Sequence, residues 1–147
     1  MTADPFLFED DPAAPGWKRW QFRESGRYNA FLEPIHVRIE DGIARVRMTP
    51  GREHANMREA VHGGALLGFM DVALFAATRG LGVLTGGAVT LDLSAQFIGA
   101  GRIGEALEAR VELLRETGRL LFLRGLVVQE REPVVASFTG TVRKMER

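Results

Sequence analysis

The sequence predicts an α+β domain in which a curled antiparallel sheet of about six strands wraps around one long central helix. Only one segment, from about His62 to Thr78, has the composition of a helix, and it is apolar nearly all round, as a buried helix is. The segments around it alternate apolar and polar residues in short runs, as antiparallel strands do. A chain of 147 residues has room for one domain, so the helix and the strands should share one core.

The start of the chain is expected to be a flexible arm. Residues 1–16 contain three prolines, which exclude a continuous helix, and chain ends are commonly mobile. The domain is therefore expected to span residues 17–147. Its first residues supply aromatic bulk that should pack on the domain: Trp17, Trp20 and Phe22.

Strand patterns lie on both sides of the helix in the sequence. Before it, residues 35–39 alternate, Asp41-Gly42 marks a tight turn, and residues 43–48 return. After it, glycines end the helix, and four further strand-like segments follow at 89–97, 107–113, 120–128 and 134–143. Their short connections indicate antiparallel pairing. Such an open sheet leaves an edge and one helix face uncovered, which a second copy could cover, so we expect at least a dimer.

Composition narrows the classes of function. Nineteen Lys and Arg balance nineteen Asp and Glu, which argues against a generic nucleic-acid binder. The chain has no cysteine, and its three histidines lack the spacing of metal ligands, so we expect no metal site. The N-terminus lacks the features of a signal peptide, and the most apolar stretch, residues 65–77, is too short to span a bilayer. A cytoplasmic protein without a membrane partner is expected.

Asp71 is the main candidate for chemistry. It is the only ionisable residue between Gly63 and Thr78, in a segment otherwise suited to a core. A buried carboxylate is unfavourable unless it is paired, so its presence needs a reason. Gly64 and Gly68, two turns and one turn back, have no side chains and leave space for a ligand beside it. A cap on a neighbouring loop or an ion pair in the core are the structural alternatives.

The predicted start of the helix, His62-Gly63-Gly64, is a candidate oxyanion hole. Helix N-termini present unpaired backbone N–H groups, and glycine lets a substrate carbonyl approach them closely. A loop-to-helix junction eased by glycine is the alternative, and a lone HGG favours it. Asn56 can reach the same pocket or serve as a turn residue. Thr90, on the polar face of its strand, can hold a water molecule or simply suit a half-buried strand.

Together these segments resemble the hotdog-fold acyl-CoA thioesterases, specifically the phenylacetate-pathway (PaaI-like) branch. The resemblance runs from about Pro34 to the C-terminus, through NMREAVHGGALLGFMDVALFAA, AVTLDLSAQFIGAGRIGEALEARV and ASFTGTVRK. In that family an asparagine precedes an HGG by six residues, and an acidic residue follows the histidine by nine. Asn56, His62 and Asp71 meet both spacings.

The resemblance implies a role for each candidate residue. Asp71 would act as the general base or the nucleophile, and Thr90 would orient the water. The Gly63 amide, aided by Asn56 and His62, would polarise the thioester carbonyl. The substrate-binding residues would then be Gly64 and Gly68 beside the carboxylate and, for the CoA phosphates, Arg115, Arg119 and Lys144.

The family also implies a homodimer or homotetramer with active sites at the dimer interface, and CoA only as part of the substrate. Trp17, Trp20 and Phe22 would line the acyl pocket or pack outside it. Glu59 departs from the pattern, because the family usually has glycine three residues before the histidine. Two alternative functions stay open: an enoyl-CoA hydratase or dehydratase, which shares this fold, and a non-catalytic acyl-CoA-binding protein.

Overall fold

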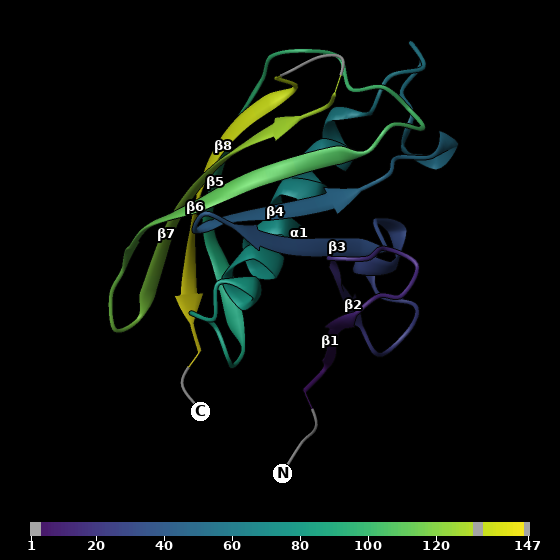
Figure 1. Cartoon of the computed structure of the whole chain (residues 1–147). Coiled ribbons are helices and arrows are strands. Elements are labelled where there is room, and N and C mark those ends of the chain that lie inside the picture. Colours follow the sequence, from purple (N-terminus) through teal and green to yellow (C-terminus); the bar gives the residue numbers. More distant parts are fainter. Residues whose placement is uncertain (1–3, 131–133, 146–147) are drawn as a thin grey trace.

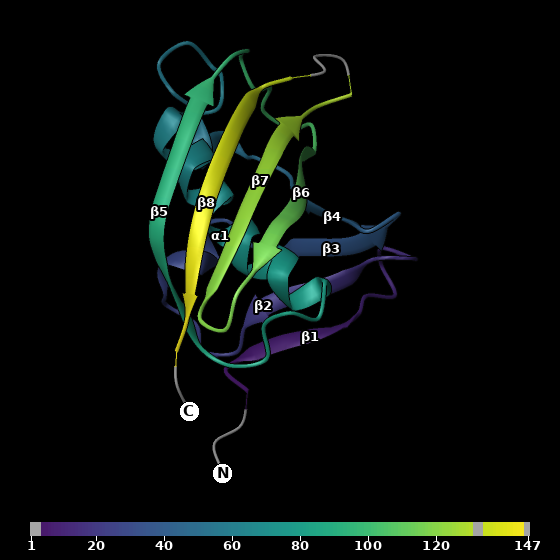
Figure 2. The same cartoon turned by 90° about the vertical axis from the view of Figure 1, so that its left-hand side faces the viewer.

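One antiparallel sheet wraps around one α-helix. The structure, a computed structural model, describes residues 4–130 and 134–145. Eight strands form the sheet in the order β1-β2-β3-β4-β6-β7-β8-β5. The sheet bends around the helix, so that β5 to β8 run along one side of it and β1 to β3 cross at its end (Figures 1 and 2). The elements are β1 (Phe6–Asp10), β2 (Lys18–Phe22), η1 (Tyr28–Phe31), β3 (Ile35–Glu40), β4 (Ile43–Met48), η2 (Arg52–His54), α1 (Gly63–Gly80), β5 (Ala88–Phe97), β6 (Leu107–Glu116), β7 (Leu120–Val128) and β8 (Ala136–Lys144).

Helix α1 lies where the sequence predicts it and is buried on all sides except one stripe. His62 is its N-cap, and the His62 Nδ1 accepts a hydrogen bond of 2.8 Å from the Gly64 N–H. Ten helix residues are buried against the sheet, among them Phe69, Met70 and Leu74. The stripe that stays exposed or half-buried repeats at helical spacing: Gly64, Leu67, Gly68, Asp71 and Phe75. No helix of the described residues is long and apolar enough to cross a membrane.

Leu74 of the helix packs directly against Gly140 of β8. A Cβ at this position would lie 2.5 Å from Leu74 Cδ1, so only glycine leaves room for the leucine. The inward side chains of the neighbouring strands complete the core, namely Ala44, Val46, Ala109, Val111, Leu121, Leu123 and Val142. The contact between Leu74 and Gly140 lies one turn of α1 from Asp71.

Residues 6–10 form a strand instead of part of a flexible arm. β1 pairs with β2, and β2 pairs with β3, which adds two strands to the six expected. The physical reason is aromatic packing: the rings of Phe6 and Trp20 stack with centroids 4.3 Å apart, and Phe22 meets Phe6 edge-on at 4.8 Å. Trp20 is only 3% exposed, so the hairpin joins the core. Residues 1–3 of the expected arm lie outside the described residues.

Strand β5 forms one end of the sheet. It pairs with β8 along its length, with a register shift between Thr90 and Asp92. Its other edge has no strand beside it within the described residues. Four large apolar side chains on and just after β5 are between 43% and 55% exposed: Val89, Leu91, Phe97 and Ile98. This edge therefore has the features of a surface that a further strand covers.

Candidate active site

Asp71 meets Thr90 on the open stripe of α1. The Thr90 Oγ1 donates a hydrogen bond of 2.6 Å to Asp71 Oδ1, and both residues are half-buried. Short bonds of this kind, from a hydroxyl to a carboxylate, are among the stronger ones in proteins. No described residue forms an ion pair with Asp71. The carboxylate is thus held in place by a neutral donor, which leaves its charge uncompensated.

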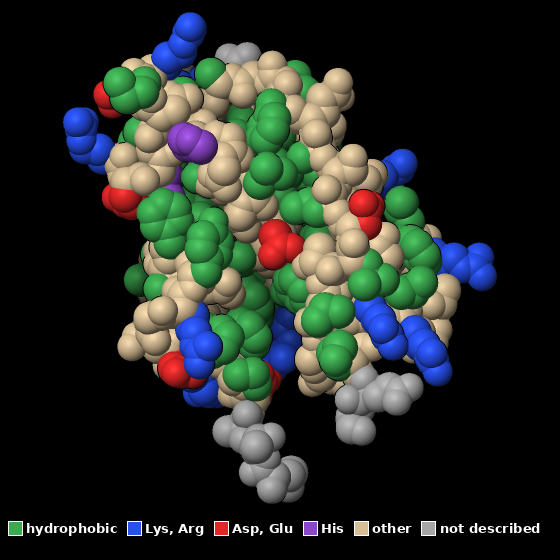
Figure 3. All heavy atoms as spheres, turned by 180° about the vertical axis from the view of Figure 1, so that it is seen from behind, with side chains coloured by type: hydrophobic (Ala, Val, Ile, Leu, Met, Phe, Trp, Pro, Cys, Tyr) green, Lys and Arg blue, Asp and Glu red, His purple; other side chains and the backbone are tan. Residues whose placement is uncertain are grey.

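A cavity of about 350 Å³ opens beside Asp71. Its wall is largely apolar and combines the open stripe of the helix with the N-terminal hairpin and the loop before β5. The other lining residues are Phe6, Trp20, Phe22, Asn29, Val72, Phe75, Arg79, Leu84, Gly86, Gly87 and Ala88. Figure 3 shows this face, with a hollow that runs between hydrophobic side chains below an exposed acidic group. A carboxylate at the mouth of an apolar cavity is the arrangement expected of an active site.

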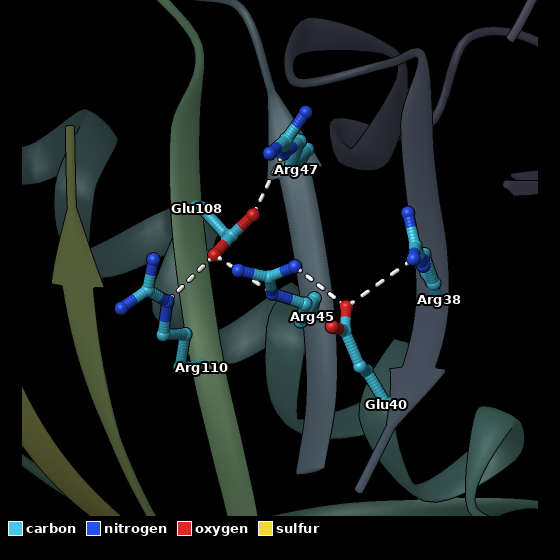
Figure 4. A network of polar contacts seen from close by, with 6 residues as sticks. All are labelled: Arg38, Glu40, Arg45, Arg47, Glu108 and Arg110. Carbon is cyan, nitrogen blue, oxygen red and sulfur yellow. Dashed lines mark hydrogen bonds and ion pairs between the residues drawn. The ribbon is translucent and has the colours of Figure 1, made fainter. Parts of the chain in front are cut away.

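Two larger hollows, of about 770 and 700 Å³, do not compete with this cavity. They are lined by residues of the sheet and of its connecting loops and include neither Asp71 nor any residue of α1. The first contains Glu108, which is buried and bonded to Arg47 at 2.8 Å, Arg110 at 2.7 Å and Arg45 at 3.2 Å (Figure 4). The one buried carboxylate at its centre is therefore already shared by three arginines.

The arginines set the titration of Glu108. Burial raises the pKa of Glu108, but the hydrogen bonds from Arg110 and Arg47 and the positive charges of Arg47 and Arg45 outweigh that effect. The net result is a pKa below the ordinary value. Glu40 extends the cluster to Arg38 and Arg45 (Figure 4). This cluster joins β3, β4 and β6 and serves the sheet rather than the cavity.

The start of α1 forms a second group of predicted residues, apart from Asp71. The Gly64 N–H donates to the His62 side chain, so Gly63 supplies the amide that a ligand can use. His62 itself is exposed. The ring of Phe97, at the end of β5, lies beside this glycine, since a Cβ at Gly63 would be 3.7 Å from it. The structure thus keeps an amide at the helix start open to a ligand.

Asn56 shapes the loop before the helix. The Asn56 Oδ1 accepts hydrogen bonds from the backbone N–H groups of Arg58, at 2.8 Å, and Ala60, at 3.1 Å. In the same loop, Glu59 has a φ of +60°, which lies in the left-handed region that favours glycine. A glycine is therefore the natural residue at this position, and Glu59 holds the same backbone at a cost in strain.

Tyr28 occupies part of the space expected beside Gly68. A Cβ at Gly68 would overlap the Tyr28 hydroxyl, so the missing side chain makes room for tyrosine as well as for a ligand. Tyr28 lies in η1, a segment without a strong sequence pattern, and nothing in the sequence indicated this contact. Within the described residues no three His, Asp or Glu gather into a possible metal site.

The three basic residues predicted for CoA phosphates lie together at one end of the sheet, where Lys144 pairs with Ala88, a residue that lines the Asp71 cavity. They lie where the β6–β7 turn meets the end of β8. The Lys144 backbone N–H donates a hydrogen bond of 2.8 Å to the Arg119 carbonyl, and the Lys144 Nζ lies 2.5 Å from the Glu116 carboxylate. Arg115 is exposed near the end of β6, just before this turn. None of the three lines the Asp71 cavity. Their contact with CoA stays a prediction.

Comparison with protein families and with solved structures gives consistent matches. The family model described as thioesterase superfamily matches residues 59–136, more than half of the chain. The chain is similar to the PaaI protein from the phenylacetic acid degradation operon of Escherichia coli, with 23% identity, a TM-score of 0.68, and coverage of 80% of this chain and 83% of that one. No curated protein sequence matches.

Two further structures add to this likeness. A point variant of the phenylacetic acid degradation protein PaaI from Thermus thermophilus is 27% identical, with a TM-score of 0.63 and coverage of 80% of this chain and 96% of that one. A hypothetical thioesterase from Streptococcus pneumoniae, solved with coenzyme A, is 19% identical, with a TM-score of 0.70 and coverage of 81% and 91%. The helix wrapped by a sheet is thus the hotdog fold expected from the sequence.

Proposed function

Because this chain belongs to the thioesterase superfamily, we propose that it hydrolyses an acyl-CoA thioester to the free acid and CoA, with Asp71 as the catalytic carboxylate. The observation that carries the proposal is the Asp71 carboxylate, fixed by Thr90 at the mouth of an apolar cavity. The coenzyme A in the similar S. pneumoniae structure supports a CoA ester as the substrate. Hydrolysis of a thioester needs only a carboxylate, water and hydrogen-bond donors for the carbonyl oxygen.

The reaction follows one of two balanced routes. In the first, Asp71 takes a proton from water, the water oxygen adds to the thioester carbon, and the CoA thiolate leaves and is then protonated. In the second, the Asp71 carboxylate itself attacks, the CoA thiolate leaves, and water hydrolyses the resulting anhydride. In either route the Thr90 hydroxyl holds the carboxylate in position, and an amide at the start of a helix stabilises the negative oxygen.

One chain does not supply the whole site. Gly63 and Asp71 are separated along α1 by about 12 Å, at about 1.5 Å per residue. The N–H groups at a helix start also point away from the rest of the helix, so an oxygen bound at Gly63 lies still farther from Asp71. Both groups have to reach a single thioester carbon. Asp71 of one subunit therefore acts together with the helix start of another.

The open edge of β5 provides a way to bring the two together. Thr90, near the start of β5, contacts Asp71, and Phe97, at its end, lies beside Gly63. If two β5 edges pair antiparallel about a point between Leu93 and Ser94, Thr90 of one copy lies opposite Phe97 of the other. That places Asp71 of one subunit near Gly63 of its partner. The exposed apolar side chains along this edge support such a dimer.

Thiol release from a panel of acyl-CoAs tests the function. The wild type should release CoA from at least one of acetyl-, octanoyl- and phenylacetyl-CoA, and Asp71→Asn should lower kcat by about 100-fold or more, the range of general-base catalysis. Asp10→Asn is the matched control, because the Asp10 side chain is 90% exposed and lies on β1. Hydration of an enoyl-CoA without thiol release would indicate a hydratase instead, and saturable binding without turnover would indicate a binding protein.

A further inference from the structure

We infer that the N-terminal hairpin, β1 and β2, forms the acyl pocket of this chain and selects uncharged, apolar acyl groups of medium size. The inference rests on the proposed function, since it assigns the substrate class of the Asp71 site. The hairpin lies outside residues 59–136, the region that matches the family model.

The walls of the pocket come from both parts of the chain. Phe6, Trp20 and Phe22 of the hairpin face Val72 and Phe75 of α1 across the cavity. Because Phe6 stacks on Trp20 and meets Phe22 edge-on, the three rings form one packed wall. Trp17 differs: it lies on the outward face, with its ring 4.4 Å from the Arg47 guanidinium, and does not line this cavity. An apolar wall of this kind binds hydrocarbon and leaves water outside.

The pocket has a defined length. It runs along α1 from Asp71 to Arg79, which is about 12 Å at about 1.5 Å per residue. Both residues line the cavity, whose volume is about 350 Å³. A medium-chain or phenyl-bearing acyl group fits this space, and an acetyl group leaves most of it unfilled. The acyl chain should therefore contribute most of the discrimination between substrates.

The positive charge of Arg79, at the end of the pocket away from Asp71, is neutralised. Arg79 forms an ion pair with Asp4, and its guanidinium carbon lies 5.9 Å from the centre of the Phe8 ring. A substrate with a terminal carboxylate would have to compete with Asp4 for this arginine and would lose its own hydration. The pocket thus accepts an uncharged acyl end and disfavours an acidic one.

A binding experiment tests the location without turnover. The chain has two tryptophans, so Asp71→Asn combined with Trp17→Phe leaves Trp20 as the only one. Octanoyl-CoA should change the Trp20 fluorescence in a saturable way and bind at least about tenfold more tightly than acetyl-CoA. CoA alone should leave the emission unchanged. In the matched control, Asp71→Asn with Trp20→Phe, octanoyl-CoA should leave the emission of Trp17 unchanged.

A kinetic experiment tests the substrate class. The wild type should prefer octanoyl-CoA to suberyl-CoA, which has the same number of acyl carbons but ends in a carboxylate, by about tenfold or more in kcat/KM. Phe22→Ala should raise the ratio of dodecanoyl- to octanoyl-CoA turnover, and Phe22→Leu should raise it less. Trp17→Ala should leave this ratio unchanged. Thermal unfolding identifies any variant that does not fold. If Phe22→Ala does not fold, Phe22→Leu serves as the test, because leucine keeps part of the apolar volume of the phenylalanine side chain.

The possible failures are distinguishable. If no acyl-CoA is bound in calorimetry or hydrolysed, the proposed function is wrong, and the inference falls with it. If Asp71-dependent hydrolysis occurs, but suberyl-CoA is preferred or folded Phe22 variants keep the wild-type chain-length profile, only the inference is overturned. The same holds if octanoyl-CoA binds in calorimetry without any response from Trp20.

Discussion

Replacing Thr90 by valine should slow the chemical step without unfolding the protein. Valine keeps the shape of the side chain and suits a strand, so the change removes only the hydroxyl that donates to Asp71 at 2.6 Å. A hydrogen bond to a charged group contributes about 1.5–3 kcal/mol. Both residues are half-buried, so water can replace part of this bond, and we expect a loss of about 1–2 kcal/mol. At about 1.36 kcal/mol per factor of ten, kcat should fall about 5- to 30-fold.

Steady-state thiol release from octanoyl-CoA measures this effect. Thr90→Ser is the matched control, because it keeps the hydroxyl and should retain most of the wild-type kcat. Equal thermal stability of the two variants would show that the fold is unchanged. If Thr90→Val kept full kcat, or if Thr90→Ser lost as much as Thr90→Val, the hydroxyl would not position the catalytic carboxylate.

Three predictions concern stability, measured as the free energy of unfolding in urea. Glu108→Gln should cost about 1.5–3 kcal/mol at pH 7, because three arginines lose their shared carboxylate. The folded state lowers the pKa of Glu108, so the stability that Glu108 contributes is present above the ordinary pKa of 4.5 and is lost as the pH falls through the folded-state pKa. The wild type should therefore lose more stability on acidification than Glu108→Gln. Parallel curves of stability against pH would contradict this. Glu59→Gly should stabilise by up to about 1 kcal/mol, because relief of left-handed strain exceeds the added entropy of the unfolded chain, and a loss of stability would show that Glu59 is unstrained. Gly140→Ala should cost about 1–3 kcal/mol through overlap with Leu74, and a neutral result would mean that the helix can shift.

The sequence predicts the central helix and the strands from β3 to β8 because the pattern of apolar residues within each segment shows which of its residues are buried. Apolar residues all round one segment and alternation in the others are enough to place them. The hairpin of β1 and β2 escapes this reasoning, since Phe6 and Phe8 lie among prolines and find their partner, Trp20, only in the folded chain. A pattern within one segment does not report which distant ring it meets.

The same distinction applies to the site. Asp71 and Thr90 are predicted from a lone charge in an apolar helix and from the polar face of a strand, and the structure joins them by a hydrogen bond. The sequence does not indicate that Tyr28 fills part of the space beside Gly68, because this contact depends on how a loop crosses the helix. The left-handed backbone of Glu59 is likewise hidden in a residue type that seldom adopts it.

Complementation between two inactive variants tests most directly whether Asp71 and the helix start of different subunits act on one thioester. Asp71→Asn removes the carboxylate. Gly63→Pro removes the amide at the first helical position, where proline fits the helix and where His62, with ψ of 138°, has the backbone that precedes proline. Each variant alone should be nearly inactive.

In an equimolar mixture that has exchanged subunits, half of the dimers are mixed, and each mixed dimer has one intact site. The mixture should therefore recover about a quarter of the wild-type thiol release per subunit, as two-fold symmetry requires. If subunit exchange is verified by mass spectrometry and the mixture stays as inactive as its components, Asp71 does not act with the helix start of a partner subunit.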